Sequence, residues 1–393
     1  MPRTDPAAPN GAEASRATLE REHASLLHWL VADAYPLWAT WGFNEATGAF
    51  AESLTSAGPI AGQPHRARVL TRQIYSYARA ADLGWSRHEA SRLVSAGIEY
   101  LLAHYRRSDG LFRTLVADDG TTIDDRAFLY EQAFVLLALA ESQTLLGRQP
   151  ELLQAAQLLR AALYQRMKRA GAGFSSGVPE ALPLQSNPHM HLFESALSWN
   201  RFDGDPAWQA LADEIVGLAL SRFIDPGTGA LREHFDANWS PLAGTPGRIV
   251  EPGHQFEWAW LLLCWGRATE GDAYRAAQRL VQIGEAHGVR DGIAINALLD
   301  DFSVHDGEAR LWPQTERLKA AVRMAAMTGE PRFWSMAAQA AAGLRRYLDT
   351  EVRGLWHDRL TVDGRFLQQP APASSFYHIV CAIDEVTAIL KAN

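Results

Sequence analysis

The sequence predicts an all-α fold, an (α/α)6 barrel in which six helical hairpins place an inner ring of helices inside an outer ring. A turn made of glycine and a following apolar residue recurs at intervals of about 60 residues, which fits two helices and a longer loop per repeat. Between the turns, apolar residues follow a helical period, and every second segment is apolar on nearly all sides. The repeated glycines are Gly48, Gly110, Gly173, Gly229, Gly292 and Gly354.

The first helix of each hairpin is expected to be amphipathic and to lie in the outer ring. The N-terminal helix is expected at about residues 17–42. Apolar residues at i, i+3, i+4 and i+7 mark "ASRLVSAGIEYLLAHY" (90–105) and "ELLQAAQLLRAALYQRM" (151–167). An early proline, where a helix tolerates it, marks "PAWQALADEIVGLALSRF" (206–223) and "PRFWSMAAQAAAGLRRYL" (331–348).

The second helix of each hairpin is expected to be buried on all sides, because runs such as "YEQAFVLLALA" and "EWAWLLLCW" have no polar face. This favours a closed double ring over an open solenoid, which would need polar caps and a wet concave face. Alternating stretches such as "LFRTLVADDGTT" predict short β-hairpins in the loops. Inner and outer helices together are expected to number twelve. The inner helices are expected to start near Arg66, Asp125, Pro188, Pro252, Leu311 and Ser374.

Composition limits the class of protein. The chain has 393 residues, 47% of them hydrophobic, which is enough for one large domain, expected at residues 16–393. A net charge of −8 without a basic run argues against a nucleic-acid partner, and no apolar stretch is long enough to predict a membrane span. Residues 1–15 are small and polar, without a signal-peptide core, and are predicted to be a disordered lead-in. Cys264 and Cys381 lie in apolar runs and are expected to be buried free thiols in a reducing cytoplasm.

Unusual polar residues collect at the starts of the inner helices. Because the inner helices of a repeated hairpin run parallel, these starts are expected to share one end of the barrel and to line one cavity. Taken singly, some have a structural explanation: Asn187 can cap a helix, and Tyr130 and His378 fit a core. His189 and His191 are two residues apart and face different sides of a helix, so one of them is expected to be structural. The residues at these starts are Arg68, Arg72, Asp125, Tyr130, Gln132, Asn187, His189, His191, Glu194, Arg248, His254, Glu257, Trp312, Gln314, Glu316 and His378.

Several familiar catalytic motifs are absent from the sequence. It contains no HExxH pair, no G-x-S-x-G elbow and no GxxxxGK phosphate loop. The two rings of "HMH" cannot chelate together from a helix, so no metal or other cofactor is expected. Two alternatives stay open: Glu257 and Glu316 on adjacent inner helices fit the paired carboxylates of a glycoside hydrolase, and a sugar-binding protein without turnover is the weaker one.

Histidines suit a reaction that moves a proton next to a carbonyl group, since their pKa lies near the working pH. Two imidazoles on opposite sides of an open-chain sugar can remove the proton from C2 and transfer protons to and from O1 and O2. The expected supporting side chains are Glu257 and Glu316 to orient an imidazole, Arg72 and Arg248 to stabilise enediolate charge, and Trp312 and Tyr130 as flat faces for the sugar.

Six motifs, in order along the chain, resemble those of the N-acylglucosamine 2-epimerase superfamily, which includes mannose isomerases, sulfoquinovose isomerase and cellobiose 2-epimerases. The resemblance runs from about residue 25 to the C-terminus, and it is specific for the superfamily rather than for the substrate. The motifs are "RQIYSYARAA", "YEQAFVLLALA", "NPHMHLFESAL", "EPGHQFEWAWLL", "LWPQTERLKAA" and "YHIV".

The resemblance implies an (α/α)6 barrel, no metal, and acid–base chemistry through a cis-enediol(ate). The family's two catalytic histidines correspond to His254 and His378. In the isomerases the one matching His378 carries the proton between C1 and C2, and the one matching His254 assists ring opening and proton transfer at oxygen; in the epimerases both act at C2 from opposite faces. The implied substrate contacts are Arg72, Tyr130, Asn187, His191, Arg248, Glu257, Trp312 and Glu316.

One departure concerns the sugar. Several members of the superfamily carry Trp four residues before the arginine that matches Arg72, whereas this sequence has Arg68, a basic residue that points toward an anionic substrate. The sequence is expected to encode a cytoplasmic aldose–ketose isomerase acting on a free hexose, with D-mannose and D-fructose as the first expectation. A sugar 2-epimerase of the same superfamily is the main alternative.

Overall fold

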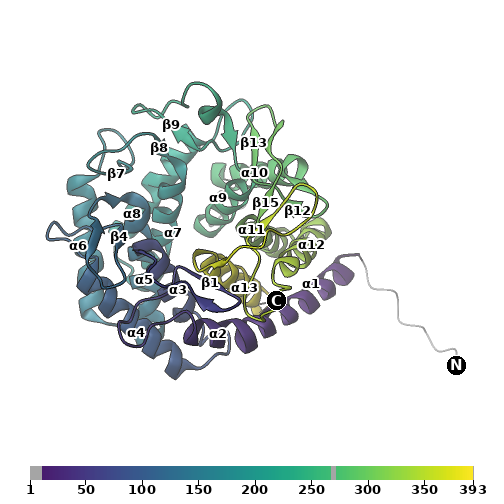
Figure 1. Ribbon diagram of the computed structural model, residues 1–393. Helices are drawn as coiled ribbons and strands as arrows, with labels where there is room; N and C mark the ends of the chain where they lie inside the picture. The colour runs from purple at the N-terminus through teal and green to yellow at the C-terminus, as the bar shows by residue number, and fades with distance from the viewer. Residues whose placement is uncertain (1–10, 267–270, 393) are drawn as a thin grey trace.

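The computed structural model describes residues 11–266 and 271–392, and it has the predicted (α/α)6 architecture (Figure 1). Each inner helix contacts the next one around a closed ring, and the last contacts the first. None of the described helices combines the length and the hydropathy needed to cross a membrane. The inner helices are α3 (Ala67–Ala78), α5 (Leu129–Leu146), α7 (Ser186–Phe202), α9 (Pro252–Trp265), α11 (Trp312–Thr328) and α13 (Ser374–Ala392).

The outer helices pack against this inner ring. The N-terminal helix contacts both helices of the last hairpin and so completes the outer ring. It continues through a π-helical turn, η1 (Leu30–Ala34), into α2 (Tyr35–Thr40), and a second π-helical turn, η2 (Ala219–Phe223), extends α8. The outer helices are α1 (Gly11–Trp29), α4 (Arg87–His104), α6 (Pro150–Arg166), α8 (Pro206–Leu218), α10 (Asp272–Gly288) and α12 (Pro331–Tyr347).

The predicted lead-in of residues 1–15 is wrong at its C-terminal end, because α1 already begins at Gly11. Leu19 and Leu26 are buried and anchor the helix on the barrel, and the guanidinium of Arg16 lies 5.4 Å from the ring centre of Trp334 on α12. These contacts reach the first turns of α1, so the helix extends past the predicted boundary. Residues 1–10 lie outside the described part of the chain.

Short antiparallel strands occupy the loops that precede the inner helices. A 3-10 turn, η3 (Thr245–Arg248), lies in one of these loops. The strands are β1 (Ser53–Thr55), β2 (Gly58–Pro59), β3 (His65–Arg66), β4 (Leu115–Val116), β5 (Thr122–Asp124), β6 (Ala127–Phe128), β7 (Gly177–Val178), β8 (Leu184–Gln185), β9 (His234–Phe235), β10 (Ile249–Val250), β11 (Val289–Arg290), β12 (Ile293–Ala294), β13 (Ala297–Leu299), β14 (Val304–Asp306), β15 (Ala309–Arg310), β16 (Arg359–Leu360) and β17 (Ala371–Pro372).

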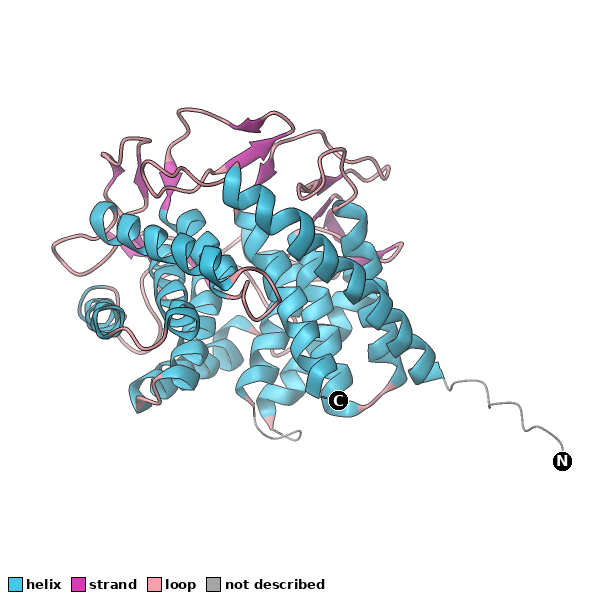
Figure 2. Cartoon of the chain, turned by 90° about the horizontal axis from the view of Figure 1, so that it is seen from below, coloured by secondary structure: helices cyan, strands magenta, loops and turns pink. Residues whose placement is uncertain are grey.

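Strand pairs connect each hairpin to the next around the ring. The predicted loop hairpins are present as β1–β2, β4–β5, β11–β12 and β13–β14. The remaining pairs join a strand before an inner helix to the following repeat: β3–β4, β6–β7, β8–β9, β10–β13, β15–β16 and finally β17–β1. Figure 2 shows the strands gathered at one end of the barrel. The N-terminal ends of the inner helices therefore lie together at that end, as the sequence predicts.

The repeated glycines form the hairpin turns, and buried glutamines fix three of these turns. All six glycines have a positive φ, between 72° and 95°, which other residues rarely adopt. Two residues after Gly110, both backbone groups of Phe112 bond to Gln132, whose Oε1 accepts at 2.8 Å and whose Nε2 donates at 2.8 Å. Gln255 binds Leu231 and Gln314 binds Ala294 in the same way. Each glutamine thus ties a turn to the first turn of an inner helix.

His189 occupies the corresponding place in the third repeat. Its Nε2 accepts the backbone N–H of Phe174 at 3.0 Å, and its Nδ1 lies 2.9 Å from the carbonyl oxygen of Gln185, to which it donates. Both ring nitrogens are therefore used when the ring is neutral, and burial lowers the pKa of His189 to about 4. Of the two neighbouring histidines, His189 has the structural role.

Replacing His189 with Gln is expected to make the protein more resistant to acid. The lowered pKa of His189 stabilises the native state above pH 6.5, and this contribution is lost as the pH falls through about 4, because the unfolded chain binds the proton first. His189→Gln should therefore retain about 3 kcal/mol more of its neutral-pH stability at pH 4 than the parent does. Urea unfolding at pH 7 and pH 4 measures this difference, and His88→Gln, at an exposed position of α4, is the control. Equal acid sensitivity of parent and His189→Gln would contradict the assignment.

Candidate active site

Three buried histidines at the strand end of the barrel each share a hydrogen bond with a carboxylate. The Nδ1 atom of His254 lies 2.8 Å from Glu233 Oε2, that of His378 lies 2.8 Å from Glu316 Oε1, and that of His191 lies 3.1 Å from Glu194 Oε2. A carboxylate only accepts, so it holds the proton of a neutral imidazole on Nδ1. The Nε2 atom then carries the lone pair that a general base needs.

His254 and His378 belong to one site, because both pack against Trp312. The ring centre of Trp312 is 4.9 Å from that of His254 and 5.8 Å from that of His378. The three side chains come from α9, α11 and α13, three consecutive members of the inner ring. The predicted convergence of these residues is thus observed.

The two histidines have opposite electrostatic surroundings. Burial alone lowers the pKa of His254, but the negative charges of Glu233 and Glu251 outweigh burial and raise that pKa to about 10. Burial lowers the pKa of His378 well below its ordinary value, and the positive charges of Arg72 and Lys319 act in the same direction. At neutral pH, His254 is therefore an imidazolium and His378 is a neutral imidazole.

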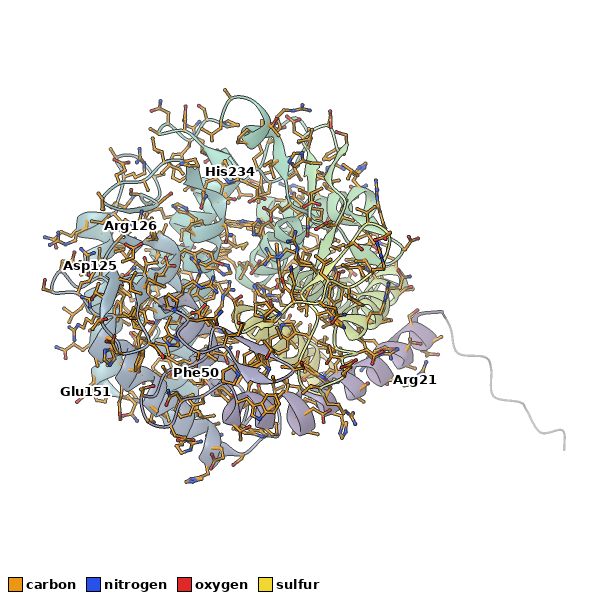
Figure 3. All side chains as sticks on the ribbon, in the orientation of Figure 1. Arg21, Phe50, Asp125, Arg126, Glu151 and His234 are labelled. Carbon is orange, nitrogen blue, oxygen red and sulfur yellow. The ribbon has the colours of Figure 1, made fainter. Side chains whose placement is uncertain are left out.

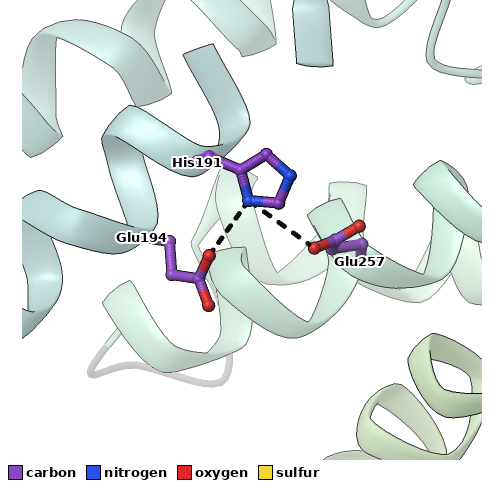
Figure 4. Close-up of side chains that lie close together, drawn as sticks. All are labelled: His191, Glu194 and Glu257. Carbon is purple, nitrogen blue, oxygen red and sulfur yellow. Dashed lines mark hydrogen bonds and ion pairs between the residues drawn. The ribbon is translucent and has the colours of Figure 1, made fainter. Parts of the chain in front are cut away.

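His191 stands between the carboxylate of Glu194, on its own helix α7, and that of Glu257, on α9. Figure 4 shows its ring directed toward Glu194 and Glu257, and its Nδ1 is 4.0 Å from Glu257 Oε1. Burial lowers the pKa of His191 to about 4, so this ring is neutral. The hydroxyl of Tyr377 donates to the second oxygen of the Glu194 carboxylate. His191 is thus fixed with Nε2 as an acceptor.

Arg72 and Tyr130 form a further part of the site, on α3 and α5. Arg72 Nη2 donates to the Tyr130 hydroxyl at 2.7 Å, and Nη1 donates to the carbonyl oxygen of Ser374 at 3.1 Å. The guanidinium lies 4.3 Å from the ring centre of Phe134, and the Tyr130 ring packs edge-on against His191 at 5.2 Å. The structure therefore brings Arg72, Tyr130 and His191 together.

Glu257 and Glu316 are both fully buried, but they differ in their partners. Glu316 accepts from His378 and forms an ion pair with Lys319. Within the described residues neither oxygen of Glu257 has a hydrogen-bond partner, and burial followed by the charge of Glu316 raises the pKa of Glu257 well above its ordinary value. The prediction that Glu316 orients an imidazole agrees with the geometry, whereas His254 takes Glu233 and not Glu257 as its partner.

Two of the predicted binding residues lack the expected contacts. Arg248 is partly exposed in η3, where Nε donates to Asp300 at 2.7 Å and Nη2 to Asp301 at 2.9 Å, and none of its described contacts reaches the histidines. Its predicted role in stabilising the enediolate is therefore unsupported, because two carboxylates already neutralise its charge. Asn187 lies in the first turn of α7, and its buried Oδ1 has no partner among the described residues.

Asp125 does not belong to the site either. It lies in the loop before β6 with Arg126 (labelled in Figure 3), is exposed, and forms an ion pair with Arg113 at 2.9 Å. It follows a turn rather than an inner-helix start, since α5 begins only at Leu129. The sequence pattern places the start of this inner helix four residues too early.

Glu233, Glu251 and Lys319 also belong to the site, although the sequence did not predict them. A signal for Glu233 is present in the repeat, because it stands four residues after Gly229. Glu52 and Asp358 stand four residues after Gly48 and Gly354, and each also bonds to the start of an inner helix, at Arg66 N–H and Ser375 Oγ. Glu233 follows this rule, and it reaches the Oγ of Ser186 at 3.2 Å as well as His254.

In the described part of the chain, three groups of side chains have potential ligand atoms within 4.8 Å of one another: His191, Glu194 and Glu257; Glu233, Glu251 and His254; and Glu257, Glu316 and His378. In each group the histidine already shares its Nδ1 proton with a carboxylate of the same group. A metal bound at Nδ1 would displace that hydrogen bond. The arrangement suits orientation of imidazoles, and the expectation of a metal-free site stays a prediction.

Comparison with known proteins agrees with the resemblance. The sequence profile of the N-acylglucosamine 2-epimerase family matches residues 48–382. The chain is 46% identical over 376 residues to a mannose-6-phosphate isomerase of Rhizobium meliloti (strain 1021), covering 93% of this chain and 97% of that protein. It is 30% identical over 307 residues to a D-mannose isomerase of Thermobifida fusca, covering 69% of this chain and 72% of that protein.

The fold has a close match among solved structures. The structure of cellobiose 2-epimerase from Spirochaeta thermophila DSM 6192 covers 96% of this chain and 98% of its own, with a TM-score of 0.84 at 21% identity. At this identity the likeness establishes the barrel alone. Together with the profile match over most of the sequence, it shows that this chain belongs to the N-acylglucosamine 2-epimerase family.

Proposed function

We propose that this protein is an aldose–ketose isomerase that interconverts a free hexose and its ketose, D-mannose and D-fructose being the first pair to test. The observation that carries the proposal is the pair of histidines against Trp312, one protonated and one neutral. Such a pair supplies an acid and a base to one substrate at the same pH. The relatives named mannose-6-phosphate isomerase and D-mannose isomerase support an isomerase of a mannose-type sugar.

In the first step the imidazolium of His254 donates its Nε2 proton to the ring oxygen, and the same nitrogen then takes the proton of the O1 hydroxyl. The ring opens to the free aldehyde and the imidazolium is restored. Glu233 and Glu251 stabilise the imidazolium, so His254 stays protonated and can act as the acid. Trp312 provides a flat apolar face beside both histidines, on which the C–H face of a sugar packs.

In the second step Nε2 of neutral His378 takes the proton from C2, and the electron pair moves into a C1–C2 double bond while O1 takes a proton from the His254 imidazolium. The His378 imidazolium then returns its proton to C1 as the O2 proton passes to Nε2 of His254, which yields the ketone at C2 and restores both histidines. No oxidant or reductant is needed, because the proton moves from C2 to C1 and the two oxygens exchange protons. Glu316 holds His378 in the required tautomer throughout.

Arg72 is the expected donor to the enediolate oxygens. Its guanidinium is buried, its Nη groups are held by Tyr130 and Ser374, and its Nε–H has no partner among the described residues. A fixed cation directed at developing charge lowers the barrier more than a mobile one. His191, neutral and fixed by Glu194, is assigned to accept a sugar hydroxyl.

The geometry disfavours the glycoside-hydrolase alternative. A retaining or inverting hydrolase needs one carboxyl as acid and a second carboxylate as nucleophile or base. Glu316 has neither oxygen free, because Oε1 accepts from His378 and Oε2 lies 2.6 Å from the ammonium of Lys319. Glu257 alone does not complete the pair.

The paired arginines favour an uncharged sugar. Arg68, whose position pointed toward an anionic substrate, forms an ion pair with the buried carboxylate of Glu131 at 2.8 Å. Arg66 pairs with Glu52 at 2.6 Å, and Arg248 pairs with Asp300. A phosphate or sulfonate group would compete with these carboxylates for each guanidinium. Cys264 and Cys381 are both free thiols, which fits the proposed cytoplasmic location. Cys381 is buried as predicted, whereas the predicted burial of Cys264 is wrong, because it is exposed near the end of α9.

A panel of sugars tests the proposal. The purified protein is incubated with D-mannose, D-glucose, mannose 6-phosphate, a sulfonated hexose, cellobiose and an aryl mannoside, and the products are separated. A ketose from free mannose is the expected result. A C2 epimer as sole product would establish the epimerase, turnover restricted to the phosphorylated sugar would overturn the uncharged substrate, and release of the aryl group would overturn the isomerase.

A further inference from the structure

A fully buried lysine lies beneath the histidines, and none of the steps above uses it. Lys319 is on α11, one helical turn after Glu316. Its ammonium lies 2.6 Å from Glu316 Oε2, 3.6 Å from Cys381 Sγ and 3.8 Å from the ring centre of Trp260. A buried ammonium costs several kcal/mol unless charges of opposite sign surround it.

Carboxylates on three inner helices provide those charges. Glu316 on α11, Glu257 on α9 and Glu194 on α7 all act on the ammonium, and the thiol of Cys381 on α13 also faces it. Glu194 has two other partners, His191 and Tyr377, and Glu257 has no hydrogen bond within the described residues. Among the described residues, only Glu316 is in ion-pair contact with Lys319.

The two oxygens of Glu316 have different neighbours, and this connects Lys319 with His378. Oε1 accepts the Nδ1 proton of His378 at 2.8 Å, and Oε2 makes the ion pair with Lys319. A protonated Glu316 would instead donate to Nδ1 and move the imidazole proton to Nε2. His378 in that tautomer cannot take a proton from carbon.

We propose that Lys319 is a positioning residue: its ammonium keeps Glu316 as a carboxylate, and Glu316 in turn keeps the proton of His378 on Nδ1. This inference rests on the proposed isomerase function of His378. Burial raises the pKa of Glu316, and Lys319 is the strongest influence that opposes this rise. The base is therefore maintained by a chain of three side chains, Lys319, Glu316 and His378.

Removal of the Lys319 ammonium tests the proposed link between Lys319, Glu316 and His378. In Lys319→Met, kcat at pH 7 should fall about 10²-fold, because Glu316 becomes neutral and His378 takes the wrong tautomer. KM should change by less than about threefold, since Lys319 touches no substrate. The activity should recover as the pH rises and Glu316 ionises, so the acid limb of the kcat profile moves to higher pH. Lys168→Met, which removes a partly exposed ion pair with Glu214 at 2.9 Å, is the matched control.

A double variant separates this role from a purely structural one. Lys319→Met leaves Glu316 buried without its cation, which endangers folding, whereas Lys319→Met combined with Glu316→Gln removes both charges. The double variant should fold and should match the kcat of Glu316→Gln alone. A double variant that stays unfolded, or is much less active than Glu316→Gln, would overturn the proposal, as would a Lys319→Met enzyme with parental kcat and an unmoved acid limb.

A spectroscopic readout keeps the inference independent of the substrate. ¹⁵N-histidine NMR, with His378 identified from His378→Asn, reports which ring nitrogen carries the proton. The parent should show the Nδ1–H tautomer, and Lys319→Met should show the Nε2–H tautomer at pH 7. An unchanged tautomer refutes the role of Lys319 whether or not the protein isomerises a sugar, whereas inactivity of the parent on every aldose refutes only the proposed function.

Discussion

His378→Asn is expected to lower kcat by about 10³-fold while the protein remains folded and still binds the sugar. Asn presents no basic nitrogen, so no group at this place can take the proton from C2. The variant should keep its fold, because Asn is smaller than His and the Glu316 carboxylate retains Lys319 as its partner. Steady-state kinetics together with thermal unfolding measure both properties.

A surface histidine provides the control for this variant. His305→Asn, at an exposed position in β14, should leave kcat and unfolding unchanged. Ring opening should continue in His378→Asn, because His254 and Glu233 are untouched. Full activity of His378→Asn would refute the assigned base, and equal losses of mutarotation and isomerisation would show that the variant disturbs the whole site.

Glu233→Gln is expected to move the basic limb of the pH–rate profile to lower pH. The acid His254 is active when protonated, so activity is lost as the pH rises through its pKa, which the carboxylates raise to about 10. Gln can still accept the Nδ1 proton but supplies no negative charge, so burial then lowers the pKa of His254. The basic limb should move down by about 2 pH units, and kcat/KM at pH 9 should drop by about 10-fold.

Glu251→Gln gives a graded comparison. The carboxylate of Glu251 lies 3.5 Å from His254 Nδ1, farther than that of Glu233 at 2.8 Å, so its removal should shift the limb in the same direction by less. At pH 6 both variants should approach parental activity, because His254 is then largely protonated. A basic limb that stays in place in Glu233→Gln would show that His254 is not the acid.

The sequence predicted the barrel because its signals are local and repeated. The glycine turns, the amphipathic outer helices and the apolar inner helices each depend on neighbouring residues, so periodicity reveals them. The strand pairs between repeats, such as β17 with β1, leave no local pattern and were not predicted. The early start of α1 was missed because Arg16 contacts Trp334, more than 300 residues away.

The site was predicted as far as the phase of the repeat allowed. His191, His254, Trp312, Glu316 and His378 share that phase, and the closed ring brings them together. The hydrogen-bond partner of each histidine depends on the tertiary structure and could not be predicted. Glu257 is nearer to His254 along the chain than Glu233 is, yet Glu233, from a loop, is the carboxylate that reaches its Nδ1. Lys319 lay inside a helical run typical of the core, where sequence alone gives no reason to expect an ammonium.

The central claim is that His378 moves a proton, and turnover of the aldose in D₂O tests it most directly. A proton held on an imidazole exchanges with solvent, so NMR of the ketose should show deuterium at C1, and residual aldose should gain deuterium at C2 as the reaction reverses. His378→Asn should show neither. Ketose formation and deuterium incorporation at the parental rate in His378→Asn would contradict the account, because a group other than His378 would then carry the proton.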